Sequence, residues 1–221
     1  MELTPALVLS MWSAGIAAAS AVVVSWRIVG PGFVRLSSTV LLLIAAGAAL
    51  AGGDFPAWAA VGAATVALML ASRVMAVVAL MSAAAALLVI GAMTDSTLLP
   101  VLTGAALLGA ITAEMVLGHW YLVDPQLPRW ALQALAFGSG VALVAELAYF
   151  LMEGVFGWTA ADAVIGWAFV ALTVLSGLLI MGVSLSLREP SYTAVMAATG
   201  LSYLAVISAF GVAVLGRTLV V

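Results

Sequence analysis

Apolar residues run along most of the chain in long stretches, which short groups of proline, glycine and charged residues interrupt. A helix needs about 20 mostly apolar residues to cross the roughly 30 Å hydrocarbon core of a bilayer. The stretches have about this length, and their interruptions predict eight membrane-spanning helices. We expect these helices near residues 5–26, 33–53, 56–72, 74–93, 98–121, 130–152, 160–187 and 191–215.

The composition favours helices in lipid over a soluble fold. Of the 221 residues, 67% are hydrophobic and 7% are charged, whereas soluble domains average about 45–50% apolar and about 25% charged residues. The stretches do not alternate with a period of two, and they are about twice as long as the strands of membrane barrels. We therefore predict an all-α, polytopic membrane protein whose first partner is the lipid bilayer. Its short loops argue against a stand-alone enzyme that acts on soluble substrates.

The charged residues between the stretches predict the orientation of the chain. Basic residues fall in every second connection, and acidic residues without basic neighbours fall in the others. The basic residues are Arg27, Arg35, Arg73, Arg129 and Arg188. Because cytoplasmic loops are enriched in arginine and lysine, we expect a multi-pass protein of the cell (inner) membrane with both termini extracytoplasmic. Arg217 follows the last predicted span, and we expect its side chain to snorkel to the interface.

Several cofactors and partners are excluded by what the chain lacks. It has no cysteine and one histidine, which excludes thiolate metal sites, iron–sulfur clusters, a self-contained histidine metal site and a bis-histidine haem. The net charge is −3 and the arginines are scattered in the sequence, so there is no basic footprint for nucleic acid or for anionic lipid headgroups. The chain contains no Walker loop, dinucleotide fingerprint or metalloprotease motif.

A shift of the sequence against itself by 94 positions indicates an internal duplication. It superposes rare residue types, namely Trp26 on Trp120, Pro31 on Pro125 and Arg35 on Arg129. The alternative is that two helix ends at one membrane interface acquired these residues independently, because that depth favours them. A duplication predicts two parallel four-helix units, residues 1–93 and 94–221, related by an axis along the membrane normal. It also predicts a site at or near their interface.

The two predicted units differ in their ionisable residues. Where the second unit carries such a residue inside an aligned helix, the first carries a small one. Ser20 aligns with Glu114, Ser25 with His119 and Gly52 with Glu146. We therefore expect the first unit to be a scaffold and the second to carry the chemistry.

Glu114 is the strongest candidate for a functional residue. It lies inside the predicted helix 98–121, where a carboxylate costs about 2.5–3.5 kcal/mol and normally faces protein or water. Together with Thr112, His119 and Tyr121 it forms a polar wedge on this helix. We expect Glu114 to exchange protons near neutral pH. The alternative is a packing role, in which the protonated side chain hydrogen-bonds a serine or threonine of another helix.

His119 lies at the predicted exit of the same helix, at the depth of the lipid headgroups and close to Tyr121. Histidine changes its charge near neutral pH. It therefore suits a proton acceptor at the cytoplasmic mouth, or a hydrogen-bond donor to a quinone carbonyl. The alternative is a snorkelling or capping residue beside an aromatic belt.

A second polar stripe follows the predicted helix 130–152 and contains Ser139, Glu146 and Tyr149, with Glu153 at its outer end in the external interface. Glu146 and Glu114 are expected to differ in depth by about 13 Å of helix rise, which is too far for a direct acid–base couple. We therefore predict a stepwise proton relay, with waters between the residues, that runs from Glu153 through Glu146 and Tyr149 to Glu114 and His119. Thr199 and Tyr203 of helix 191–215 are expected to line the site, and the alternative is that they are ordinary contacts between helices.

These patterns favour a small transporter-like or proton-conducting protein that uses intramembrane carboxylates. The first alternative is a membrane subunit of a quinone-linked respiratory or redox complex, with a quinone near His119 and cofactors on other membrane subunits. The second alternative is a non-catalytic assembly or anchoring subunit. Association with other membrane subunits, or with further copies of the chain, is compatible with all three.

Overall fold

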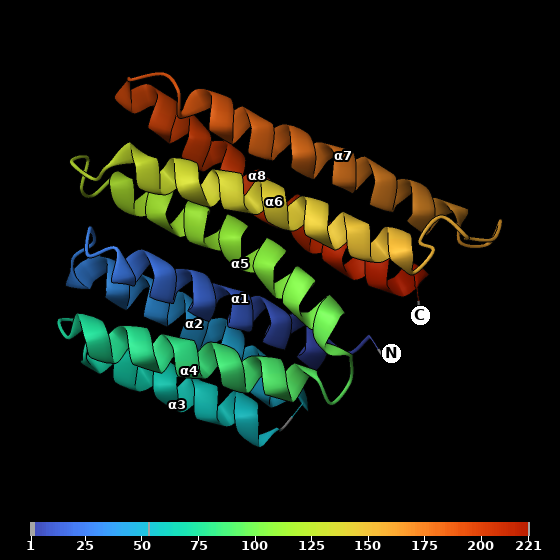
Figure 1. The fold of residues 1–221 in the computed structure, drawn as a ribbon, viewed down its shortest axis with the longest axis horizontal. Coiled ribbons are helices and arrows are strands. Elements are labelled where there is room, and N and C mark those ends of the chain that lie inside the picture. Colours follow the sequence, from blue (N-terminus) through green and yellow to red (C-terminus); the bar gives the residue numbers. More distant parts are fainter. Residues whose placement is uncertain (1–2, 53, 221) are drawn as a thin grey trace.

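The computed structural model describes residues 3–52 and 54–220, and within them the fold is all-helical, with eight helices and no strand (Figure 1). The helices are α1 (Pro5–Ser25), α2 (Pro31–Gly52), α3 (Phe55–Met69), α4 (Val74–Ala92), α5 (Leu98–Tyr121), α6 (Arg129–Met152), α7 (Ala163–Ser186) and α8 (Tyr192–Leu219). The predicted fold class is confirmed, and each helix coincides with one predicted span. Residue 53, where the second predicted span ends, and residues 1 and 221, the outer limits of the predicted units, lie outside the described residues.

Seven of the helices in the described part of the chain are long and apolar enough to cross a membrane. The exception is α3, whose 15 residues rise by about 22 Å, less than the roughly 30 Å of hydrocarbon. The chain is therefore a multi-pass membrane protein in contact with the lipid bilayer. The membrane in which it resides remains a prediction.

Polar side chains fix where α1 and α7 begin. At the start of α1, the Thr4 hydroxyl accepts a hydrogen bond from the N–H of Leu7 (3.1 Å), which satisfies one of the unpaired N–H groups of the first turn. Before α7, the Thr159 hydroxyl donates a hydrogen bond to the Asp162 carboxylate (2.8 Å) and holds the chain in a turn. Helix α7 therefore begins at Ala163, later than the predicted residue 160.

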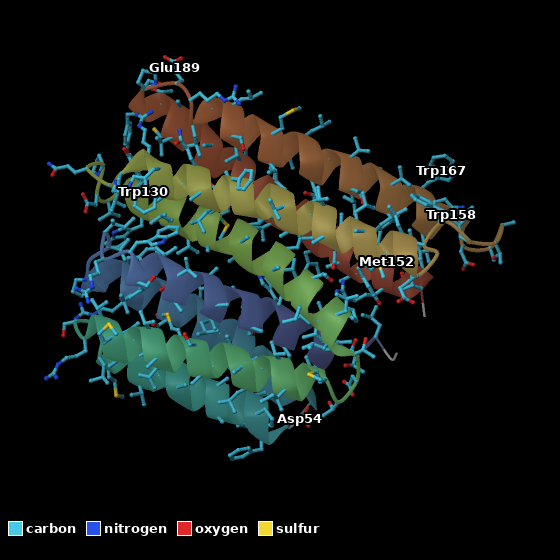
Figure 2. All side chains as sticks on the ribbon, in the orientation of Figure 1. Asp54, Trp130, Met152, Trp158, Trp167 and Glu189 are labelled. Atoms are coloured by element: carbon cyan, nitrogen blue, oxygen red, sulfur yellow. The ribbon has the colours of Figure 1, made fainter. Side chains whose placement is uncertain are left out.

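Successive helices run in opposite directions, so that both termini lie at the same end of the bundle (Figure 1). Five basic residues lie at the other end, which we call the arginine end: Arg27, Arg35, Arg73, Arg129 and Arg188. The end with the termini carries Asp54, Asp95, Glu153 and Asp162, and we call it the acidic end. Figure 2 shows Trp130 at the arginine end, and Asp54 and Trp158 at the acidic end. Which end faces the cytoplasm remains a prediction.

The eight described helices pack as two rings of four. In the first ring (α1–α4) each helix contacts the next and α4 closes on α1, and the second ring (α5–α8) repeats this order of contacts. The rings meet where α1 packs on α5 (Figure 1). At this seam the backbones of Gly15 and Gly109 touch, since a Cβ atom built on Gly109 would lie 2.3 Å from the Gly15 carbonyl carbon. The shift of 94 positions superposes these two glycines, while the duplication itself remains a prediction.

Candidate functional site

The side chain of Glu114 lies inside the second ring and is 3% exposed. It borders a void of about 10 Å³ to which all four helices of the ring contribute, enough for about one water molecule. The void is lined by Ile111, Glu114, Ala136, Ser139, Ile180, Val183 and Ala205. The predicted site residues Glu114 and Ser139, from α5 and α6, therefore meet at one cavity.

The Glu114 carboxyl group lies beside a serine hydroxyl of α8, and one of its oxygens has no partner among the described residues. The Ser202 hydroxyl of α8 is its hydrogen-bonding neighbour, and this hydroxyl also donates to the carbonyl oxygen of Thr199 (2.7 Å). The other carboxyl oxygen, Oε1, is buried and has no hydrogen-bond partner among the described residues. Buried polar atoms are normally paired, so this free oxygen points to an additional partner, such as water, a proton or a ligand.

Glu146 of α6 forms an ion pair with Arg217 of α8, at 2.6 Å between Oε1 and Nη1. Both side chains are 0% exposed. The guanidinium also donates hydrogen bonds to the carbonyl oxygens of Pro100 (2.6 Å) and Ala213 (2.8 Å), and it lies 5.4 Å from the ring centre of Phe150. Arg217 therefore ties α5, α6 and α8 together near the acidic end.

The predicted snorkelling of Arg217 to the interface is wrong. Helix α8 continues to Leu219, past the predicted end at residue 215, and this places Arg217 inside the helix with its side chain in the ring. Gly104 of α5 makes the room, because a Cβ atom there would lie 2.4 Å from Nη2 of Arg217. The sequence did contain an indication of this ion pair. The carboxylate at residue 146 had no cation assigned to it, and buried charges need partners of opposite charge.

The ion pair makes Glu146 different from Glu114. Glu146 is paired with the Arg217 guanidinium, whereas no cation is paired with Glu114 among the described residues. Tyr149 lies within electrostatic range of Glu146, Arg217 and Glu153. Ser139, which borders the Glu114 void, precedes Glu146 by seven positions on α6, or about 10 Å of helix rise. The two glutamates are thus separate groups at different depths.

His119 and Tyr203, which come from α5 and α8, meet near the arginine end. The Tyr203 hydroxyl and His119 Nδ1 are 3.2 Å apart and form a hydrogen bond, and both residues are exposed on the surface of the chain. Tyr121 does not join them: it is 5% exposed and packs in a hydrophobic cluster with Leu117 and Leu127. The polar wedge predicted on α5 is therefore divided among different neighbours.

Two of the predicted lining residues make contacts between helices. Thr112 accepts a hydrogen bond from the indole N–H of Trp12 (2.8 Å), which joins α5 to α1 across the seam between the rings. Thr199 bonds the carbonyl oxygen of Val195 (2.9 Å) and packs on Gly118, where a Cβ atom would lie 2.6 Å from its Oγ1. Neither hydroxyl borders the Glu114 void.

The polar groups of the second ring occur at successive depths along α8. Tyr203 lies 11 positions after the start of α8 at the arginine end, Ser208 is bonded to Ser176 of α7 (2.9 Å), and Arg217 lies near the acidic end. The 14 positions from Tyr203 to Arg217 rise by about 21 Å, which is most of the hydrocarbon thickness. These groups therefore follow the bundle across the membrane.

The described residues contain no group of three or more histidine, cysteine, aspartate or glutamate side chains that could hold a metal ion. The chain matches no protein-family model, no curated protein and no solved structure. The chemistry of the second ring is therefore the basis for a functional assignment.

Proposed function

We propose that this membrane protein moves protons, or a solute coupled to protons, through the second ring, with Glu114 as the proton-exchanging group. The observation that carries this proposal is the free, buried Oε1 of Glu114 beside a void for about one water. A carboxyl group without a cation in a low-dielectric interior is most stable when it carries a proton. It releases that proton when water or a polar ligand reaches it, and intramembrane acids commonly serve in this way.

The other polar groups of the second ring supply a route on either side of Glu114. His119 suits the entry or exit of protons at the arginine end, because it is exposed there and an imidazole ring can both accept and donate a proton. Between Glu114 and the acidic end follow, in this order, the Ser176–Ser208 hydrogen bond, the Glu146–Arg217 ion pair and Tyr149. Because neighbouring groups are on the order of 10 Å apart, the route needs water molecules between them. Arg217 holds the Glu146 carboxyl group in place through their ion pair at 2.6 Å.

Proton flux into liposomes tests the role of Glu114. We expect E114Q to lower the flux driven by an imposed pH gradient by about 100-fold, because glutamine keeps the shape and the hydrogen bond to Ser202 but cannot carry the proton. A pH-sensitive dye inside the vesicles measures the rate. The matched control is E189Q, which changes an exposed glutamate at the arginine end and should leave the flux within about twofold. Equal fluxes for the wild type and E114Q, or no flux in the wild type, would contradict the proposal.

The second candidate function is a membrane subunit of a quinone-linked redox complex, and the His119–Tyr203 hydrogen bond is the observation in its favour. A histidine and a tyrosine on the surface, both able to donate hydrogen bonds, suit a quinone carbonyl. Native purification followed by mass spectrometry distinguishes the two functions. A redox subunit should carry quinone and cofactor-bearing partners and lose the quinone in H119A. An assembly subunit should retain partners without quinone and show no proton flux.

A further inference from the structure

A groove on the outside of the second ring leads toward Glu114. It has a volume of about 460 Å³, within the range of about 300–1,000 Å³ that is typical of ligand pockets. Residues of α6 and α7 line it: Ala136, Phe137, Gly140, Val141, Val144, Ile180 and Ser184. Ala136 and Ile180 also line the void beside Glu114, so these two side chains separate the groove from the void.

The groove opens toward the lipid. Phe137 is 73% exposed and Val144 is 68% exposed, and such side chains on a membrane helix contact the hydrocarbon. Helices α6 and α7 also pack against each other less closely than the other neighbouring pairs of the second ring. A molecule that occupies this groove therefore arrives from the bilayer, and its body must be apolar.

We propose that a lipid-dissolved primary amine enters between α6 and α7 and binds Glu114 as an ammonium ion. This inference rests on the proposed function and names the class of solute for the same site. A neutral amine crosses hydrocarbon far more easily than its ammonium form, because burying an unpaired charge is costly. At the site, the proton moves from the Glu114 carboxyl oxygen to the amine nitrogen. An ammonium–carboxylate pair results, and no other reactant is needed.

The residues that line the groove favour an amine as the polar group of the solute, in addition to an apolar remainder. The groove is lined by apolar side chains apart from the Ser184 hydroxyl and includes no basic side chain, so nothing there competes for the carboxylate. Because the side chains of Ala136 and Ile180 separate the groove from the void, they must move apart to admit a head group, and a slender –NH₂ group requires the smallest movement. A quaternary ammonium would require a larger movement and cannot accept a proton.

Access to Glu114 from the lipid can be tested without a transport assay, by labelling the protein with dicyclohexylcarbodiimide. This lipid-soluble reagent adds the O–H of a carboxylic acid across one of its C=N bonds, and the product rearranges to a stable N-acylurea without a leaving group. Mass spectrometry of peptides from the protein in lipid vesicles then reports the labelled residue. We expect labelling of Glu114. Glu146 should remain unlabelled, because it is paired with Arg217. A charged, water-soluble carbodiimide should not reach Glu114.

Two glycines of α6 provide matched variants. Gly140 borders the groove, and a Cβ atom there would lie 3.8 Å from Ile180, whereas a Cβ atom at Gly138 would meet nothing within 4 Å. Because G140L fills the groove, it should slow the labelling of Glu114 by about tenfold or more. G138L adds the same side chain to the same helix outside the groove and should leave the rate unchanged. Equal rates in the two variants would exclude this route.

Protection of the wild-type protein tests the solute itself and does not depend on a variant that folds. Dodecylamine in the vesicles should slow the labelling of Glu114, whereas dodecanol and dodecyltrimethylammonium at the same membrane content should not. Protection by all three, or by none, would overturn the inference. If proton flux depends on Glu114 while labelling is insensitive to both G140L and dodecylamine, the proposed function stands and the amine does not.

Discussion

Replacing Arg217 with methionine is expected to lower the free energy of unfolding by about 3–5 kcal/mol, because the Glu146 carboxylate then stays buried without its cation. The two side chains are 0% exposed and 2.6 Å apart, so water cannot replace the guanidinium without opening the ring. The variant also leaves the Pro100 carbonyl without the guanidinium hydrogen bond. Unfolding in mixed micelles, followed by tryptophan fluorescence, measures the difference.

Two further variants show whether the loss comes from the unpaired charge. The double variant E146Q/R217M removes both charges and should recover most of the stability, because the penalty belongs to a carboxylate left alone. R188M removes an exposed arginine at the arginine end and should change the unfolding free energy by less than about 0.5 kcal/mol. A loss for R217M no larger than that for R188M would show that the pair does not hold the ring together.

The positions of the helices follow from the sequence because the bilayer imposes them. Lipid allows no unpaired backbone groups, so each apolar stretch of sufficient length must be a helix, and polar residues mark its ends. The apolar stretches located all eight described helices, but they placed the end of α3 at residue 72 instead of Met69 and did not reveal that the Thr159–Asp162 turn delays α7. The ends of helices depend on local side-chain hydrogen bonds, which a pattern of apolar residues does not encode.

The burial of Glu114 was also predictable, since a carboxylate at that depth must face protein or water. Its surroundings were not. The void exists because four helices meet at small or branched side chains such as Ala136 and Ala205, and no local pattern specifies that meeting. Glu146 was predicted as a proton-exchanging group without its partner, because Arg217 lies 71 positions away and reaches it through the room left by Gly104.

Replacing Gly109 with alanine is the change expected to separate the two rings. Its Cβ atom would lie 2.3 Å from the Gly15 carbonyl carbon and oxygen, and because these are backbone atoms of α1, a helix and not a side chain must move. Overpacking of this kind lowers stability by about 1–3 kcal/mol and sometimes by more, and α1 and α5 cross closely because their small residues permit it. The Trp12–Thr112 hydrogen bond crosses the same seam, and it should be lost when α1 and α5 separate.

The matched control is G62A on α3, where a Cβ atom would meet nothing within 4 Å and alanine should stabilise the helix by up to about 1 kcal/mol. Opposite signs for G109A and G62A in micelle unfolding, with unchanged helix content by circular dichroism, would locate the damage at the seam. G15A should resemble G109A, and G15A/G109A should cost less than the sum of the two single variants, because both act at one helix crossing. If G109A were as stable as G62A, contacts other than the crossing of α1 and α5 would join the rings. One ring could then move against the other without disturbing those contacts.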